Sequence, residues 1–220
     1  MHKLVNIPAD HVSLEGELVL PEYTSSIVLF AHGSGSSRFS PRNNYVASVL
    51  QQAGIGTLLF DLLTREEDRT QTRFDIDLLT QRLLTATAWI RQESSTQSFS
   101  IGYFGASTGA AAALQASAEM NGEISAVVSR GGRPDLAGPA ALAKVSAPTL
   151  LIVGGYDDVV IMLNRDAYAQ LNCEKELTII PGATHLFEEP GTLEQAAQVA
   201  AQWFTDHLTK STATPSPARR

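Results

Sequence analysis

The sequence contains a single cysteine, Cys173, which cannot form an internal disulfide, and no Cys/His cluster has the spacing of a zinc site. No apolar run approaches the ~20 residues that a membrane-spanning helix needs. The chain starts MHKLVN and lacks the apolar stretch of a signal peptide. These absences predict a cytoplasmic protein that uses neither a metal nor a cofactor.

Charged residues are also sparse, at 18%, and acidic side chains outnumber basic ones, which gives a net charge of −7. Because nucleic acids and anionic membranes repel an acidic chain, neither is expected as a main partner. The 44% of hydrophobic residues is typical of a globular protein, and 220 residues suffice for one sizeable core. A small molecule is therefore the expected partner. The oligomeric state stays open, with a homodimer as one option.

The hydrophobic pattern changes after the first twenty residues. Residues 3–8 and 12–20 alternate between polar and apolar side chains, which predicts an antiparallel hairpin. Continuous apolar runs then predict strands buried on both faces, at residues 26–31, 56–60, 99–104, 124–129, 149–153 and 177–180. Helical patterns separate these runs, at residues 43–53, 74–92, 108–120, 164–171 and 193–207. The alternation predicts an α/β fold with a mostly parallel, doubly wound sheet.

We expect a single domain over residues 1–209. Residues 210–220 are rich in Ser, Thr, Pro and Ala, a composition that predicts a disordered tail. No cap domain is expected over the sheet. The interval 130–148, where such caps are commonly inserted, holds one short helical pattern at residues 140–145, whereas a covering pair of helices needs roughly 25 residues.

A G-A-S-T-G segment at residues 105–109 joins a predicted strand to a predicted helix. The chain reverses so sharply in such a turn that the serine needs a strained backbone, and the glycines leave room for the neighbouring elements. The turn places the Ser107 hydroxyl above the sheet, where the Thr108 amide can stabilise an oxyanion. A lone G-x-S-x-G match is more often an ordinary turn, but the flanking strand and helix favour a nucleophile.

A second loop, H-G-S-G-S-S at residues 32–37, also follows a predicted strand. A loop in this position supplies the second oxyanion donor to such a serine turn, and the Ser34 amide is the candidate. The alternative is a phosphate-binding loop, but the segment lacks the Lys-Ser/Thr ending of a P-loop and the third glycine of a dinucleotide-binding motif. His32 is interpreted as a structural residue that braces the loop.

A serine nucleophile needs a base and an acid, which in this arrangement follow it along the chain in the order acid, histidine. His185 follows the strand predicted at residues 177–180 and lies on a loop at the same sheet edge as Ser107. Asp157 and Asp158 follow the strand predicted at residues 149–153. Asp135, one strand earlier, is a rival acid.

Four arginines at this edge are candidate substrate-binding residues: Arg130, Arg133, Arg38 and Arg42. Arg130 and Arg133 follow a predicted central strand, so they could bind a carboxylate or phosphate of a substrate. In the alternative interpretation they form structural ion pairs with Asp135 or Asp61. The same two interpretations hold for Arg38 and Arg42, which follow the H-G-S-G loop.

Taken together, four motifs resemble the dienelactone hydrolase-like branch of the α/β-hydrolase superfamily, over roughly residues 26–207. They are H-G-S-G at 32–35, G-A-S-T-G at 105–109, G-G-Y-D at 154–157 and G-A-T-H at 182–185. The resemblance implies the α/β-hydrolase fold and a triad of Ser107, Asp157 and His185, because the G-x-x-D turn of the family selects Asp157 over Asp158. Dienelactone hydrolases carry a cysteine nucleophile where this chain has Ser107, and serine-bearing relatives are usually described as esterases or unassigned hydrolases.

The sequence therefore predicts a carboxylesterase-like serine hydrolase that cleaves small carboxylic esters through an acyl-enzyme. An acyltransferase or a C–C bond hydrolase could use the same triad, because the shape of the substrate pocket chooses the acceptor. A non-catalytic binding protein on the same fold is a further alternative, which the complete Ser-Asp-His set disfavours.

Overall fold

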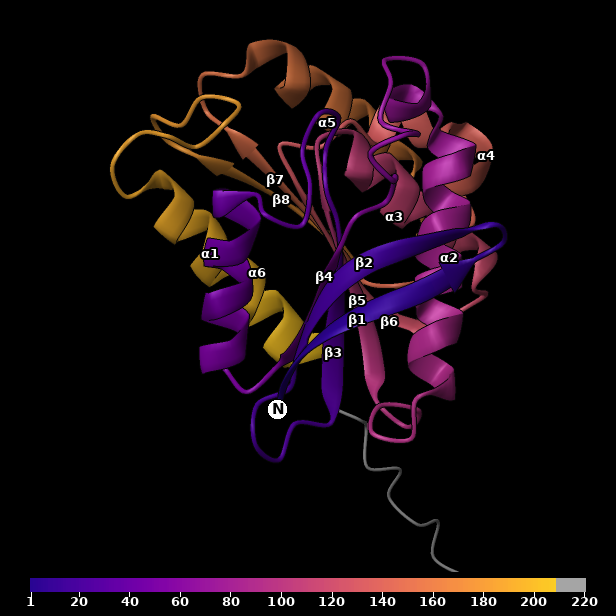
Figure 1. Cartoon of the computed structure of the whole chain (residues 1–220). Helices are drawn as coiled ribbons and strands as arrows, with labels where there is room; N and C mark the ends of the chain where they lie inside the picture. Colours follow the sequence, from indigo (N-terminus) through magenta and orange to yellow (C-terminus); the bar gives the residue numbers. More distant parts are fainter. Residues whose placement is uncertain (209–220) are drawn as a thin grey trace, which may run out of the picture.

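The structure is a computed structural model in which residues 1–208 are described (Figure 1). The tail predicted at residues 210–220 lies outside the described residues. The strands are β1 His2–Ala9, β2 Val12–Val19, β3 Ser26–Ala31, β4 Gly56–Phe60, β5 Ser100–Ala106, β6 Ile124–Arg130, β7 Thr149–Gly154 and β8 Lys175–Ile180. The helices are α1 Pro41–Gln52, α2 Ile76–Gln92, α3 Thr108–Glu119, α4 Pro139–Leu142, α5 Asp158–Gln170 and α6 Thr192–Leu208, with 3₁₀ turns η1 Thr72–Phe74 and η2 Pro134–Ala137.

All eight strands form one sheet, in the order β1-β2-β4-β3-β5-β6-β7-β8. β2 pairs antiparallel with both β1 and β4, and the remaining neighbours are parallel. The prediction of a mostly parallel sheet with an N-terminal antiparallel hairpin is confirmed. The winding direction reverses between β3 and β5, and ligands of such sheets bind outside the carboxyl ends of the strands at that point.

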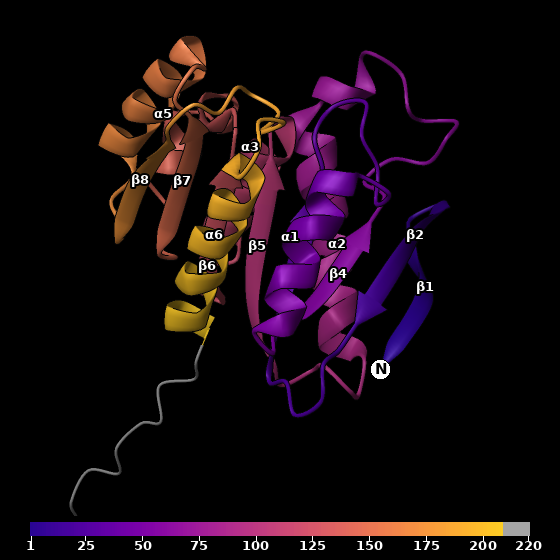
Figure 2. The same cartoon turned by 90° about the vertical axis from the view of Figure 1, so that its left-hand side faces the viewer.

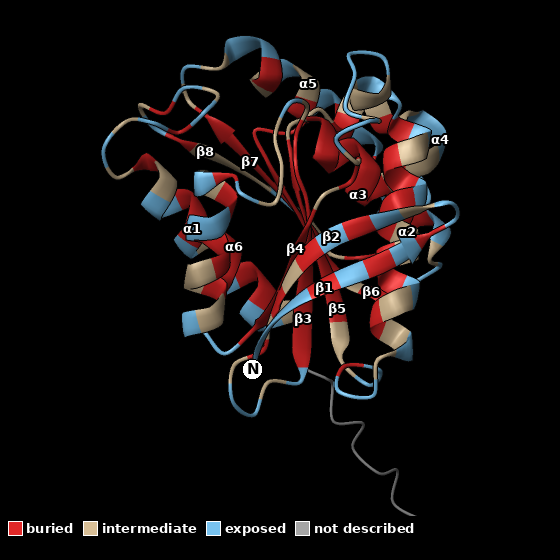
Figure 3. Ribbon diagram, viewed as in Figure 1, coloured by how far each residue is buried: buried red, intermediate tan, exposed pale blue. Residues whose placement is uncertain are grey.

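Helices cover both faces of the sheet. α1 and α6 pack together on one face, and α2 and α3 pack together on the other (Figure 2). Successive side chains of β3 enter opposite cores, because Ile27 and Leu29 face the α2/α3 layer while Val28 and Phe30 face the α1/α6 layer. The central strands are therefore buried throughout, which explains their continuous apolar sequences (Figure 3).

One helix begins earlier than its sequence pattern predicts. The pattern predicts residues 164–171, whereas α5 already begins at Asp158. Its first turns expose Val159 and Met162, and its buried face includes the polar Asn164, so the apolar period is obscured. The Asn164 amide nitrogen donates to the carbonyl oxygens of Gly132 and Val160, which offsets part of the cost of burying this side chain, while its Oδ1 has no partner among the described residues.

Between β6 and β7 the chain forms only η2 and the short helix α4. No cap domain is present within residues 1–208, as predicted. In that same part of the chain, no helix combines the length and hydrophobicity that crossing a membrane requires.

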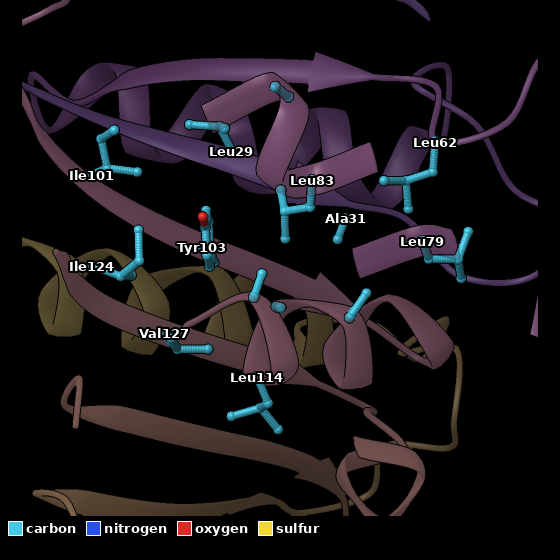
Figure 4. Packing of buried hydrophobic residues seen from close by; sticks show 14 of the residues in the cluster. Leu29, Ala31, Leu62, Leu79, Leu83, Ile101, Tyr103, Leu114, Ile124 and Val127 are labelled. Atoms are coloured by element: carbon cyan, nitrogen blue, oxygen red, sulfur yellow. The ribbon is translucent and has the colours of Figure 1, made fainter. Parts of the chain in front are cut away.

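Tyr103 is among the largest fully buried side chains and lies between the sheet and α2 (Figure 4). Its hydroxyl is 2.7 Å from Thr87 Oγ1, which is itself 2.8 Å from the carbonyl oxygen of Leu83. Because a carbonyl can only accept, Thr87 donates to Leu83 and Tyr103 donates to Thr87. Burial raises the pKa of Tyr103 well above its ordinary value, so the phenol stays a donor.

Because the hydrogen bonds run from Tyr103 through Thr87 to Leu83, removing the Tyr103 hydroxyl and removing the Thr87 hydroxyl should lower the free energy of unfolding by different amounts. Tyr103→Phe removes a donor and leaves Thr87 bonded to Leu83, so we expect a loss of about 1 kcal/mol in the free energy of unfolding. Thr87→Val leaves a buried phenol without an acceptor and should cost more, about 2–3 kcal/mol. Urea unfolding of both variants measures the difference. A larger loss in Tyr103→Phe than in Thr87→Val would contradict the unequal roles given to the two hydroxyls.

Candidate active site

Ser107 stands at the turn between β5 and α3 in a backbone conformation that residues other than glycine rarely adopt, with φ 50° and ψ −122°. Backbone hydrogen bonds hold it there. Its N–H donates to the carbonyl oxygen of Arg130 at 3.4 Å, and its own carbonyl accepts from Ala110 at 3.1 Å and from Arg133 at 3.0 Å. The strained conformation is thus fixed from both sides, by α3 and by the end of β6.

The glycines around this turn are required by backbone contacts. A Cβ at Gly105 would lie 2.4 Å from Ala110 Cα, and one at Gly109 would lie 2.1 Å from the carbonyl oxygen of Ala31. The loop after β3 also comes close, because a Cβ at Gly33 would lie 2.9 Å from Ser107 Cβ and 3.2 Å from the carbonyl oxygen of Ala106. The H-G-S-G loop and the serine turn therefore touch through their backbones at the switch point of the sheet.

His185 and Asp157 lie on adjacent loops at the same edge. His185 Nδ1 is 2.6 Å from Asp157 Oδ2. The loops are joined by the N–H of Tyr156, which donates to the carbonyl oxygen of Ala183 at 2.9 Å. Gly154 lies so close to this second loop that a Cβ there would be 2.5 Å from the Ala183 oxygen. The two strand ends thus determine the distance between the carboxylate and the imidazole.

The other candidate acids lie elsewhere. Asp158 begins α5 and is exposed, while Asp135 in η2 binds Arg133. The side chain of Asp157 is 16% exposed and that of His185 is 40% exposed, so the carboxylate is covered while the imidazole is accessible. The structure therefore brings Asp157 to His185.

Ser107 and His185 face the same strand end, although no hydrogen bond joins their side chains among the described residues. Gly131 directly follows Arg130, whose carbonyl accepts from Ser107, and a Cβ at Gly131 would lie 3.7 Å from His185 Cε1. The hydrogen bond between nucleophile and base is often longer in unliganded enzymes and shortens when substrate binds.

The two candidate oxyanion donors contact each other. The Ser34 N–H donates to the side-chain oxygen of Thr108 at 2.9 Å, while the Thr108 amide is in the first turn of α3. The sequence predicted a Ser34 amide that faces an oxyanion, but here a hydroxyl occupies that donor. The motif did not indicate this contact, because only the close approach of the two loops brings the Thr108 side chain beneath Ser34.

His32 braces the first loop, in agreement with its structural interpretation. Its Nε2 accepts the N–H of Leu62 at 3.0 Å, and its Nδ1 lies 3.0 Å from the carbonyl oxygen of Gly33. These partners define a neutral ring that carries its proton on Nδ1. Burial lowers the pKa of His32 below its ordinary value and is the largest cause of the shift.

Two of the four candidate arginines are neutralised by carboxylates. The guanidinium of Arg38 contacts Asp61 and lies 2.5 Å from Glu15. Arg133 makes two hydrogen bonds to Asp135, at 2.9 and 2.7 Å. For Arg38 and Arg133 the structure thus shows the ion pairs of the structural interpretation.

The other two arginines lie together between α1 and the loop that carries His185. Arg42 contacts the exposed Glu188 at 3.5 Å. Arg130 is only 6% exposed, and its Nη2 donates to Asn43 Oδ1 at 3.3 Å while its guanidinium lies 5.4 Å from the centre of the Phe187 ring. Burial, with a further contribution from Arg42, lowers the pKa of Arg130 to about 10, so it stays charged at neutral pH.

Glu189 also shapes the site, and no motif pointed to it. Its carboxylate accepts the backbone N–H of Thr184 at 3.0 Å and the Thr184 hydroxyl at 2.7 Å. These hydrogen bonds lower the pKa of Glu189. The two hydrogen bonds join the ends of the loop from Thr184 to Glu189, which contains His185. In the same loop, the buried Phe187 adopts a left-handed backbone with φ 56°. The only sequence signal is the spacing between a threonine and a glutamate five residues later.

A cavity of about 850 Å³ opens beside the H-G-S-G loop. Its walls come from the β1–β2 hairpin, from residues 36–39 and from residues 61–68. His32 reaches it from the H-G-S-G loop, whereas Asp157 and His185 do not line it. In the described chain, no three His, Cys, Asp or Glu side chains are grouped so that they could hold a metal ion.

The fold and the strand-end site together define an α/β hydrolase. The family model for the alpha/beta hydrolase domain matches residues 24–211, and the chain belongs to this family. A solved dienelactone hydrolase from Anabaena variabilis is 58% identical, with a TM-score of 0.92 over 94% of this chain and 98% of the other. Est1E from Butyrivibrio proteoclasticus shares the fold at 15% identity, with a TM-score of 0.81 over 94% and 99% of the two chains.

A relative from Mycobacterium tuberculosis (strain H37Rv) carries the provisional name of a phosphoribosyl transferase. It is 58% identical over 205 residues, which are 93% of this chain and 46% of that protein. The chain thus spans about half the length of this relative. The family match and the 58%-identical solved neighbour support a hydrolase.

The burial of His32 predicts that the free energy of unfolding depends on pH. Its folded pKa is lower than the ordinary value of 6.5, so below about pH 6.5 the unfolded chain binds a proton that folded His32 does not. The free energy of unfolding should therefore fall as the pH drops below about 6.5, by up to about 1.4 kcal/mol per pH unit. His32→Gln keeps an acceptor for Leu62 and should remove this part of the slope.

Urea unfolding of both proteins across this pH range measures the effect. Other titrating groups are common to both proteins, so the difference between the two curves isolates His32. Parallel curves would contradict the role given to its burial.

Proposed function

We propose that this chain is a serine hydrolase that cleaves small carboxylic esters through an acyl-enzyme on Ser107. The observation that carries the proposal is the 2.6 Å pair of His185 and Asp157 at the sheet edge where Ser107 stands in its strained turn. The 58% identity to a solved dienelactone hydrolase supports the same class of chemistry.

The proposed reaction follows from the weakness of a neutral hydroxyl as a nucleophile. His185 Nε2 takes the Ser107 proton as Oγ attacks the ester carbonyl, and Asp157 accepts the Nδ1–H and stabilises the imidazolium. The imidazolium then protonates the departing alkoxide. Water attacks the acyl-enzyme with His185 again as the base, which releases the carboxylic acid and restores the Ser107 hydroxyl.

In this proposal the oxyanion is bound by the amides of Thr108 and Ser34. The Thr108 amide lies at the N-terminus of α3, where the helix dipole also favours negative charge. The oxyanion would replace the Thr108 hydroxyl as the acceptor of the Ser34 N–H. Each donor of this kind contributes about 3–4 kcal/mol in comparable sites.

The name of the mycobacterial relative suggests a second reaction class, phosphoribosyl transfer. We do not carry that reaction over to this chain, because the chain covers only 46% of that protein and the alpha/beta hydrolase model matches residues 24–211 of the chain itself. An acyltransferase or a C–C bond hydrolase with the same triad would share all the features above, and the choice of acceptor distinguishes them.

Ser107→Ala tests the nucleophile. We expect the variant to fold but to lose essentially all hydrolysis of p-nitrophenyl acetate and all labelling by a fluorophosphonate probe, because both need the Oγ atom. Thermal unfolding verifies the fold. Retention of more than a few per cent of the wild-type rate, after contaminating esterases are excluded, would rule out Ser107.

Paired substitutions test the acid. Asp157→Asn should reduce kcat by orders of magnitude, because an amide at this position favours the wrong imidazole tautomer. Asp158→Asn is the matched control and should cost little, since Asp158 is exposed at the start of α5. Steady-state kinetics on the same ester compares the two. A large loss in the control alone would reassign the acid.

A further inference from the structure

Arg130 is a buried cation that lacks a counter-charge. In the described residues, no carboxylate lies within ion-pair distance of its guanidinium, and its Nε has no hydrogen-bond partner. Arg82 is equally buried, at 4% exposed, and its Nε also has no hydrogen-bond partner, but its guanidinium lies 2.6 Å from Glu67. The chain therefore neutralises one of these two buried arginines and leaves the other without a partner charge.

The contacts described so far do not supply the guanidinium of Arg130 with an opposite charge or with acceptors for all of its N–H groups. Arginine cannot release its proton at neutral pH, and buried charges in proteins are paired with opposite charges or bind a ligand. The partners of Arg130 are the amide oxygen of Asn43 and the face of the Phe187 ring, and neither carries a formal charge. The remaining hydrogen-bonding capacity of its planar fork matches a carboxylate or a phosphate.

The surroundings of Arg130 also favour an anion. Its side chain reaches the first turn of α1, which has no acidic residue to offset the positive end of the helix dipole. Arg42 belongs to the same turn and is close enough to lower the pKa of Arg130. Among the described residues, Arg42 forms an ion pair only with Glu188, whose side chain is 65% exposed, and such surface pairs are weak and exchangeable.

We propose that Arg130, Arg42 and the first turn of α1 form an anion-binding subsite that takes a carboxylate or phosphate group next to the candidate active site. Arg130 is joined to the serine turn through its backbone, because its carbonyl oxygen accepts the Ser107 N–H, and its guanidinium lies over Phe187 in the loop that carries His185. The bound group displaces Glu188 from Arg42 and completes the fork of Arg130. An anion carried by the substrate rests on the proposed hydrolase function, whereas a free anion does not.

Phosphate binding tests the subsite without any catalytic step. Thermal unfolding at constant ionic strength, with inorganic phosphate replacing chloride, should show stabilisation of the wild type by phosphate. Arg130→Met should abolish it, raising the apparent Kd about ten- to a hundredfold. Arg133→Gln is the matched control, because it removes one positive charge from the same loop but one that Asp135 already neutralises.

We expect Arg130→Met to fold, since an apolar chain of similar length removes an unpaired buried charge. Arg42→Gln, at a more exposed position, should also weaken phosphate binding and gives an independent test if the first variant is unstable. Absence of phosphate stabilisation in the wild type, or equal stabilisation of the wild type, Arg130→Met and Arg42→Gln, would overturn the proposal.

A second measurement identifies the source of the anion. The ratio of kcat/KM for mono-p-nitrophenyl succinate to that for neutral p-nitrophenyl pentanoate should fall about tenfold or more in Arg130→Met if the substrate carries the anion. An unchanged ratio, with phosphate binding still dependent on Arg130, identifies a free anion as the ligand. Absence of hydrolysis with phosphate binding intact would reject the esterase and retain the subsite.

Discussion

The contact between the serine turn and the end of β3 is the constraint on which the site depends. Gly109 lies so close to the carbonyl oxygen of Ala31 that no side chain fits between α3 and β3. This contact fixes where α3 begins, and therefore fixes the left-handed backbone of Ser107 one residue earlier. The cost of that backbone, about 1–3 kcal/mol, is offset by the surrounding sheet, whose two cores hold β3 and β5 in register.

Backbone contacts also position the loops that carry Asp157 and His185. The acid and histidine loops touch at Gly154, and the histidine loop approaches the end of β6 at Gly131. Because these contacts join main chains, the distance between Asp157 and His185 depends little on side-chain flexibility. In the proposed reaction, the rigid strand ends that carry Ser107, Asp157 and His185 supply the preorganisation that catalysis requires.

Much of this arrangement follows from sequence, and the exceptions have physical causes. The strands and the strand-end loops that carry Ser107, Asp157 and His185 could be predicted because buried parallel strands have continuous apolar sequences and sharp turns need glycine. The start of α5 could not, since Asn164 interrupts its buried face while Val159 and Met162 are exposed. The contact of Ser34 with the Thr108 hydroxyl and the brace of Thr184 by Glu189 depend on how loops meet, which local patterns do not encode.

The net charge of the chain likewise does not determine how charges pair at one site. A net charge of −7 disfavours polyanionic partners, but it does not decide the affinity for a small anion at one site. Surface charges more than about 8–10 Å away are largely screened at physiological salt, whereas a guanidinium 4 Å from an anion at an effective dielectric constant of 20 contributes about 4 kcal/mol. Arg130 is buried and lacks a carboxylate partner, so its local field outweighs the average of the surface. In the anion-binding subsite that we propose, the pairing of individual charges therefore matters more than their sum.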